Sequence, residues 1–268
     1  MPDTTAAAGL RAIFQPLTLV RAAMMRFGLG SFETRLALDA FRRPWYAYGM
    51  YEAADLARRL KLPAITAIEF GVAGGDGLVE MEAIARELEK ALGVQIHVVG
   101  FDTGEGMPEE HDYRDLPYIW KRGLYKMDVD HVKSRLSRAE LVLGNVARTV
   151  PSILERGLAG PIGFAVFDLD YYSSTVDAFR IFDGPVGAYL PRVLCYFDDI
   201  MSGTQMYHCE EVGELLAIRE FNESRPKDQK IRPAHNLIGS LPMRPAWAER
   251  IWVHHRFEHP QYETYIGR

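Results

Sequence analysis

The stretch AITAIEFGVAGGDG, residues 64–77, carries the features that decide the fold. Its first seven residues are mostly apolar and partly β-branched, which is typical of a short buried strand. An acid, Glu69, precedes a run of glycines, and residues 78–92 have helical periodicity. A second apolar run, QIHVVGF at 95–101, ends at Asp102. These features predict a strand, a tight turn, a helix and a second strand.

The same alternation continues toward the carboxyl end of the chain. We expect helices near residues 48–60, 129–136, 175–182 and 210–222, and further strands at 140–143, 163–167, 192–197, 235–241 and 250–257. The last two runs predict an antiparallel hairpin. Strands that alternate with helices predict an α/β, Rossmann-like, doubly wound fold with a mostly parallel seven-stranded sheet, and ligands then bind outside the carboxyl ends of the strands.

The first 45 residues differ from the rest of the chain. They read as helical segments interrupted by Gly28, Gly30 and Pro44, so we expect an N-terminal helical extension (1–45) before the main domain (46–268). Residues 10–25 predict an amphipathic helix, which packs on the domain, on a second subunit or on a membrane surface. A homo-oligomer formed through this extension is one outcome of such packing.

Composition excludes several classes of protein. Hydrophobic residues make up 48% and charged residues 25%, which is ordinary for a globular protein. The net charge of −5 argues against nucleic acid as a partner. With only two cysteines and with neither a signal segment nor an apolar membrane span, we expect a cytoplasmic location.

The glycine turn predicts a ligand site. It does not fit the dinucleotide fingerprint, because Ala73 stands where the second glycine would be. Glu69 in front of the turn would repel a diphosphate and attract a sulfonium or an amino group, as in S-adenosylmethionine. Asp102, which ends the next strand, stands where a ribose diol would be held. The alternative is a plain glycine turn.

Further acids follow two later strands. Asp168 follows 163–167, and Asp198 with Asp199 follows 192–197, so their carboxylates converge at one edge of the sheet. Such convergence is costly unless a cation or a proton neutralises it, and oxygen ligands without Cys or His suit Mg²⁺, with Mn²⁺ or Ca²⁺ as alternatives. The competing interpretation is that these acids cap helices.

Two residues are candidates for proton transfer. Asp170 lies two positions beyond Asp168, so either acid is the ligand while the other acts as base or as a helix cap. His208 follows the acid pair closely and is a second candidate base. His254 and His255 lie in an expected strand, where a surface or core role fits better.

The blocks EFGVAGG (69–75), GFDTGEGMP (100–108), FDLDYYSST (167–175) and YFDDI (196–200) resemble, in this order, the motifs of class I S-adenosylmethionine-dependent methyltransferases, and among these the macrocin O-methyltransferase type. The likeness covers about residues 45–222. It implies O-methylation of a small hydroxylated acceptor, a sugar or natural product. It assigns the cofactor to Glu69, Gly71, Val72, Ala73, Gly75, Asp102, Thr103 and Asp168, and a metal to Asp168, Asp198 and Asp199. At residues 103–105 the chain departs from the family, which usually has a bulkier aromatic there, so the acceptor is not identified.

Residues 108–125 place four aromatic side chains among charges in a segment longer than an ordinary loop. This pattern fits a lid over the active site, and it fits core packing equally well.

Two other functions compete with methyl transfer. One is a non-catalytic protein that binds an adenosyl ligand. The other is a metal-dependent phosphatase, because VFDLD resembles a dehalogenase-type opening, although no lysine stands between the two acid blocks.

Overall fold

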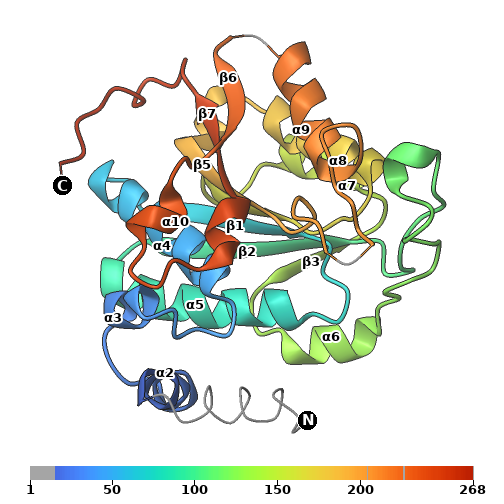
Figure 1. Ribbon diagram of the computed structural model, residues 1–268. Coiled ribbons are helices and arrows are strands. Elements are labelled where there is room, and N and C mark those ends of the chain that lie inside the picture. Colours follow the sequence, from blue (N-terminus) through green and yellow to red (C-terminus); the bar gives the residue numbers. More distant parts are fainter. Residues whose placement is uncertain (1–15, 204, 226, 268) are drawn as a thin grey trace, which may run out of the picture.

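Seven strands form one sheet in the order β3-β2-β1-β4-β5-β7-β6 (Figure 1). The computed structural model describes residues 16–203, 205–225 and 227–267. Five strands are parallel: β1 (Ala64–Phe70), β2 (Gln95–Asp102), β3 (Glu140–Leu143), β4 (Ile162–Phe167) and β5 (Tyr189–Phe197). The other two, β6 (Gln229–Pro233) and β7 (Ile251–Arg256), are antiparallel to their neighbours. This is the mostly parallel, Rossmann-like sheet that the sequence predicts.

The register aligns the carboxyl ends of four strands. Phe70 pairs with Phe101 on one side and with Phe167 on the other, and Phe167 pairs with Phe197. The four rings stack across the sheet with centroids 4.9 to 5.2 Å apart. Because the strands are parallel and in register, the residues that come after these rings lie along one edge of the sheet.

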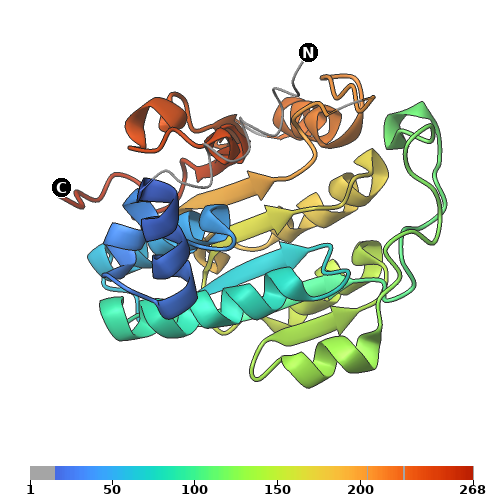
Figure 2. The ribbon, with the colours of Figure 1, turned by 60° about the horizontal axis from the view of Figure 1, so that its bottom comes forward.

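Helices cover both faces of the sheet (Figure 2). The first face packs against α3 (Phe32–Ala37), α4 (Pro44–Arg59), α5 (Asp76–Leu92) and α6 (Val129–Arg135). The second face packs against α7 (Val146–Arg156), α8 (Tyr172–Ala178) and α9 (Gly213–Ser224). The central strands β1 and β4 are buried along their whole length, which explains why their sequences are continuously apolar.

The antiparallel pair is confirmed, but the expected strand at 235–241 is wrong. The hairpin partner of β7 is β6, in which only Ile231 is buried, so the sequence of β6 carries little apolar signal. The expected segment instead forms a short helix, α10 (Leu237–Ser240). Asn236 in the left-handed conformation, with φ of 60°, precedes this helix and breaks the extended path.

Besides α4, which begins at Pro44 and not near residue 48, two helices differ from the expectation. The helix expected at 175–182 is α8, which begins earlier and continues as a 3-10 turn at Phe179–Asp183. The sequence reading did not include α7, which carries Pro151 inside it. Two features of the sequence indicate this helix. Asn145 is a typical N-cap residue, and in the structure its side chain accepts a hydrogen bond from the amide of Ala147. Val146, Val150 and Ile153 follow at helical spacing.

The extension before the sheet contains α2 (Pro16–Phe27) and α3. Phe32 and Phe41 belong to the same apolar cluster as α4 and α5, and the expected boundary at residue 45 falls in the first turn of α4. Several apolar side chains of α2 and its connection are exposed: Leu17, Leu19, Val20, Met25, Phe27 and Leu29. Residues 10–15 of the expected amphipathic helix lie outside the described residues. A homo-oligomer through this extension stays a prediction.

In the described ranges, every helix is too short or too polar to cross a membrane.

Candidate active site

A cavity of about 520 Å³ opens where the aligned strands end, a size typical of small-molecule sites. Nearly all of the residues predicted for the site line it. These are Glu69, Gly71, Val72, Ala73, Asp102, Thr103, Asp168, Asp170, Asp198, Asp199 and His208. Gly75 does not line the cavity. It stands at the N-terminus of α5, and a Cβ there would lie 2.9 Å from a methyl group of Val132.

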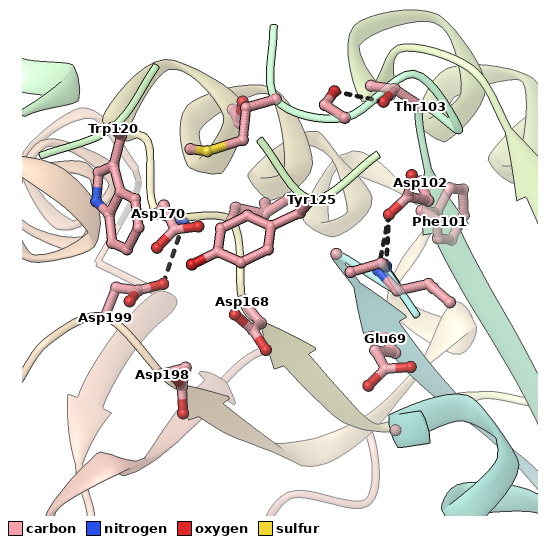
Figure 3. Close-up of a pocket in the computed structure, with 18 of the residues that line it drawn as sticks. Glu69, Phe101, Asp102, Thr103, Trp120, Tyr125, Asp168, Asp170, Asp198 and Asp199 are labelled. Carbon is pink, nitrogen blue, oxygen red and sulfur yellow. Dashed lines mark hydrogen bonds between the residues drawn. The ribbon is translucent and has the colours of Figure 1, made fainter. Parts of the chain in front are cut away.

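The glycine turn is held by the carboxylate of Asp102. Its Oδ2 accepts hydrogen bonds from the amides of Val72 and Ala73, at 3.0 and 2.9 Å, and its Oδ1 accepts one from the amide of Gly104 at 2.7 Å (Figure 3). Asp102 therefore ties the turn after β1 to the segment after β2. Thr103 begins that segment, where its hydroxyl donates to the carbonyl of Gly106.

Gly71 and Gly77 are needed for close approach in this turn. Gly71 has φ of +86°, and a Cβ on it would lie 1.8 Å from the carbonyl oxygen of Asp168. A Cβ on Gly77 would lie 1.8 Å from Oε1 of Glu69. Any larger residue at either position displaces β4 or the Glu69 carboxyl group.

Glu69 is 2% exposed at the end of β1. The hydroxyl of Tyr46 donates to its Oε1 at 2.6 Å, whereas its buried Oε2 lacks a partner among the residues that the structure describes. Burial raises the pKa of Glu69 to about 7, and the hydrogen bond from Tyr46 partly opposes that shift. A cationic group placed beside Oε2 would restore the ionised form.

Three carboxylates meet at the other end of the cavity. Asp168, Asp198 and Asp199 each offer an oxygen, and these oxygens lie within 4.8 Å of one another (Figure 3). Burial raises the pKa values of Asp168 and Asp199 well above their usual range, and neighbouring carboxylates raise them further. Such a group is stable at neutral pH only with bound protons or with a cation.

Three residues that were not predicted as site residues hold this acid cluster in place. Arg250 donates to Oδ1 of Asp198 at 2.6 Å, and the hydroxyl of Tyr196 donates to the same oxygen. Glu214, fully buried in the first turn of α9, accepts a hydrogen bond from the amide of Asp199 at 3.1 Å. Glu214 does not directly follow a strand, and Arg250 is 52 residues from Asp198. No local sequence pattern therefore predicts that these two residues contact the acid cluster.

Asp170 stands beside the cluster. Its amide donates to Oδ2 of Asp199 at 3.1 Å, and its backbone has φ of 59°. Burial and the charge of Asp168 raise the pKa of Asp170 to about 7. A carboxylate with such a pKa is matched to accept a proton near neutral pH.

The structure places His208 in the cavity and places His254 and His255 away from it. His208 lines the cavity, and burial together with Arg250 lowers its pKa, so its imidazole is neutral at pH 7. His254 is fully buried against the rings of Phe182 and Phe221, and His255 shares a hydrogen bond with the hydroxyl of Tyr262. Neither lines the cavity, as expected for core and surface histidines.

The segment 103–126 projects beyond the strand ends and is drawn in green in both ribbon views (Figures 1 and 2). Its aromatic side chains both pack in a buried cluster and line the cavity, and its role as a lid stays a prediction. Trp120 is 7% exposed and packs with Leu116 and Tyr171, yet it also lines the cavity. Tyr125 is largely exposed, and its hydroxyl points toward Asp170 and Asp199 (Figure 3).

The segment is anchored by a buried acid that the sequence reading did not single out. Asp115 accepts hydrogen bonds from the amide and the hydroxyl of Ser173 in α8, and from the amide of His111. These bonds tie the segment that carries Trp120 and Tyr125 to α8.

The order of the strands, the glycine turn after β1 and the acids at the strand ends define the fold of class I S-adenosylmethionine-dependent methyltransferases. A crystal structure of the calicheamicin methyltransferase CalS11 shares this fold with a TM-score of 0.51 and 21% identity, over 90% of this chain and 91% of that chain.

Two further solved structures are more distant. An apo structure of CalS11, described as a TDP-rhamnose 3'-O-methyltransferase, has a TM-score of 0.46 and 20% identity over 90% of this chain and 93% of its own. The plantazolicin methyltransferase BpumL with S-adenosylhomocysteine has a TM-score of 0.37 and 10% identity over 90% and 95%. No family model and no curated protein matches the chain. The narrower resemblance to macrocin O-methyltransferases stays a prediction.

Proposed function

We propose that this protein is an S-adenosylmethionine-dependent O-methyltransferase that acts on a hydroxyl group of a small molecule, a sugar or natural product, with the assistance of a divalent metal. One observation carries the proposal. A single cavity has the glycine turn and Glu69 at one end and the cluster of Asp168, Asp198 and Asp199 at the other. The first end suits a cationic adenosyl cofactor, and the second suits a metal and a hydroxyl group.

The acid cluster fits a hard divalent cation such as Mg²⁺. Its ligands are carboxylate oxygens, and within the described chain only Asp198 has a cationic partner, Arg250. When bound, such a cation lowers the pKa of a hydroxyl group and orients it. Asp168, Asp198 and Asp199 would hold it, and the amide of Asp199 is fixed by Glu214.

In the proposed reaction the acceptor oxygen forms a bond to the cofactor methyl carbon while the bond from that carbon to sulfur breaks. Asp170 accepts the hydroxyl proton on its carboxylate, for which its raised pKa is suited. His208 is the second candidate base because its neutral ring faces the same cavity. Trp120 and Tyr125 cover the acceptor side and limit the entry of water.

The test uses S-adenosylmethionine with a labelled methyl group and a panel of hydroxylated sugars and phenols. We expect labelled product, release of S-adenosylhomocysteine and loss of activity with a chelator. Asp170→Asn should lower kcat by roughly 10²- to 10⁴-fold with unchanged cofactor affinity, as expected for a general base, and Asn tolerates the left-handed backbone at this position. A larger loss in His208→Gln would assign the base to His208.

The competing functions give different results in the same experiment. A non-catalytic binding protein would retain S-adenosylhomocysteine and produce no methylated product with any acceptor. A metal-dependent phosphatase would hydrolyse p-nitrophenyl phosphate and would not bind the cofactor. Either result would contradict methyl transfer.

A further inference from the structure

Among the residues that the structure describes, Arg43 is a cation of the cavity wall that forms no ion pair. Arg43 immediately precedes α4 and lines the cavity together with Glu69 and Gly77. Its guanidinium lies over the ring of Tyr46, with 5.2 Å between Cζ and the ring centroid. In the described part of the chain this guanidinium forms neither a salt bridge nor a hydrogen bond. Arg250, the other arginine of the cavity, is paired with Asp198.

A carboxylate oxygen without a partner lies at the same end of the cavity. Oε2 of Glu69 is buried and has no hydrogen-bond partner among the described residues, whereas its Oε1 is satisfied by Tyr46. An unpaired buried carboxylate oxygen is unfavourable unless a ligand supplies a donor. With respect to the described residues, the glycine-turn end therefore presents the unpaired guanidinium of Arg43 and the unpaired Oε2 of Glu69.

The start of α5 adds to the positive potential at this end. This helix of 17 residues begins after Gly75, which provides no side-chain cap, so the partial positive charge of its N-terminus is not offset by a capping side chain at that position. The acid in its first turn, Asp76, forms an ion pair with Arg135. The charge of Asp76 is thus offset, and Arg43 is not needed to neutralise it.

We propose that Arg43 binds the α-carboxylate of the methionyl part of the cofactor while Glu69 binds its ammonium group. This inference rests on the proposed function, because it concerns the same cofactor. In an amino acid zwitterion the ammonium and carboxylate groups are bonded to the same α-carbon. The oppositely charged side chains of Arg43 and Glu69 match these two groups. A guanidinium presents several donors in one plane, which suits two bonds to a carboxylate.

The experiment compares two ligands that differ only in the carboxylate: S-adenosylmethionine and decarboxylated S-adenosylmethionine. Calorimetry measures the affinity of each for wild type, for Arg43→Gln, and for Arg42→Gln as matched control. Arg42 is the exposed neighbour and does not line the cavity. Arg43→Gln should bind S-adenosylmethionine about 10- to 100-fold more weakly, as for a lost charge-assisted bond, and should bind the decarboxylated ligand within about twofold of wild type. The control should retain both affinities.

The preference of the wild type for the ligand with a carboxylate is the decisive quantity, because partial unfolding of a variant lowers both affinities alike. Equal losses for the two ligands, or no loss for either, would overturn the role of Arg43 while leaving cofactor binding intact. A wild type that binds neither ligand would instead overturn the proposed function itself. Arg43→Lys, which keeps the charge, should retain part of the preference.

Discussion

The hydroxyl of Tyr46 in α4 donates a 2.6 Å hydrogen bond to Oε1 of Glu69 at the end of β1, so a helix that precedes the sheet holds a carboxyl group that lines the glycine-turn end of the cavity. The bond favours the ionised form of Glu69, whereas burial favours the protonated form. Burial is the larger effect, and together with the smaller opposing charges of Arg43 and Asp102 it leaves the pKa of Glu69 at about 7.

We therefore expect cofactor affinity to depend on pH. Ionised Glu69 attracts the cofactor ammonium group and protonated Glu69 does not, so affinity for S-adenosylhomocysteine should increase as the pH rises through the pKa of about 7. Tyr46→Phe removes a bond to the ionised form and should move this increase to higher pH. Calorimetry between about pH 6 and pH 9 measures it, and an affinity independent of pH in both proteins would argue against contact with Glu69.

The acid cluster should make thermal stability depend on metal. Mg²⁺ should raise the melting temperature of the wild type, by about 2 to 4 °C for each kcal/mol of binding. Asp168→Asn and Asp199→Asn should lose this response because each removes a ligand charge. Asp130→Asn, at an acid of α6 remote from the cluster, is the control and should keep it. A wild type with no response to Mg²⁺, Mn²⁺ or Ca²⁺ would contradict the metal site.

The response to metal should be larger at pH 8 than at pH 6. The pKa of Asp170 is about 7, and those of Asp168 and Asp199 are raised, so protons compete with the cation at lower pH.

Without metal the folded state holds protons that the unfolded chain releases. The free energy of unfolding contributed by Asp170 therefore falls as pH rises from about 4, the usual carboxyl value, to about 7. Differential scanning fluorimetry at both pH values, with and without Mg²⁺, measures whether the metal response increases and whether the metal-free stability decreases as pH rises.

Two neighbouring glycines should respond differently to the same substitution. Gly71→Ala places a Cβ against the carbonyl of Asp168 in a backbone with positive φ, and should lower the free energy of unfolding by about 2 to 4 kcal/mol. Gly74→Ala places its Cβ in open space and should cost little. Denaturant titration of both variants makes the comparison. Equal stabilities would mean that the turn after β1 does not contact β4 closely.

Asp102 should contribute to stability as well as to binding. Asp102→Ala leaves the amides of Val72, Ala73 and Gly104 without their acceptor, which should cost about 1 to 3 kcal/mol of unfolding free energy even without cofactor. It should also weaken cofactor binding because the glycine turn loses its fixed position. A variant as stable as wild type with weakened binding would limit Asp102 to ribose contact.

The sequence by itself determined the parallel core of the sheet. The runs at β1, β2, β4 and β5 are largely apolar because both faces of these strands are covered, and each is followed by an acid or a glycine turn. Since parallel strands end at a common edge, the sequence order alone placed Glu69, Asp102, Asp168 and Asp198 around one cavity. Local pattern and a general property of parallel sheets were sufficient for this part.

Only the tertiary structure decided which groups partner these acids. Tyr46 lies in α4, Glu214 lies in α9, and Arg250 immediately precedes β7. Arg43 and Arg250 line the cavity, whereas Tyr46 and Glu214 form hydrogen bonds with Glu69 and Asp199 from outside it, because α4 and α9 pack on the sheet. The edge strand β6 was missed for a related reason: it buries only Ile231, so its position depends on pairing with β7 and not on its own apolar pattern. Partners across the fold are set by packing, which local sequence does not encode.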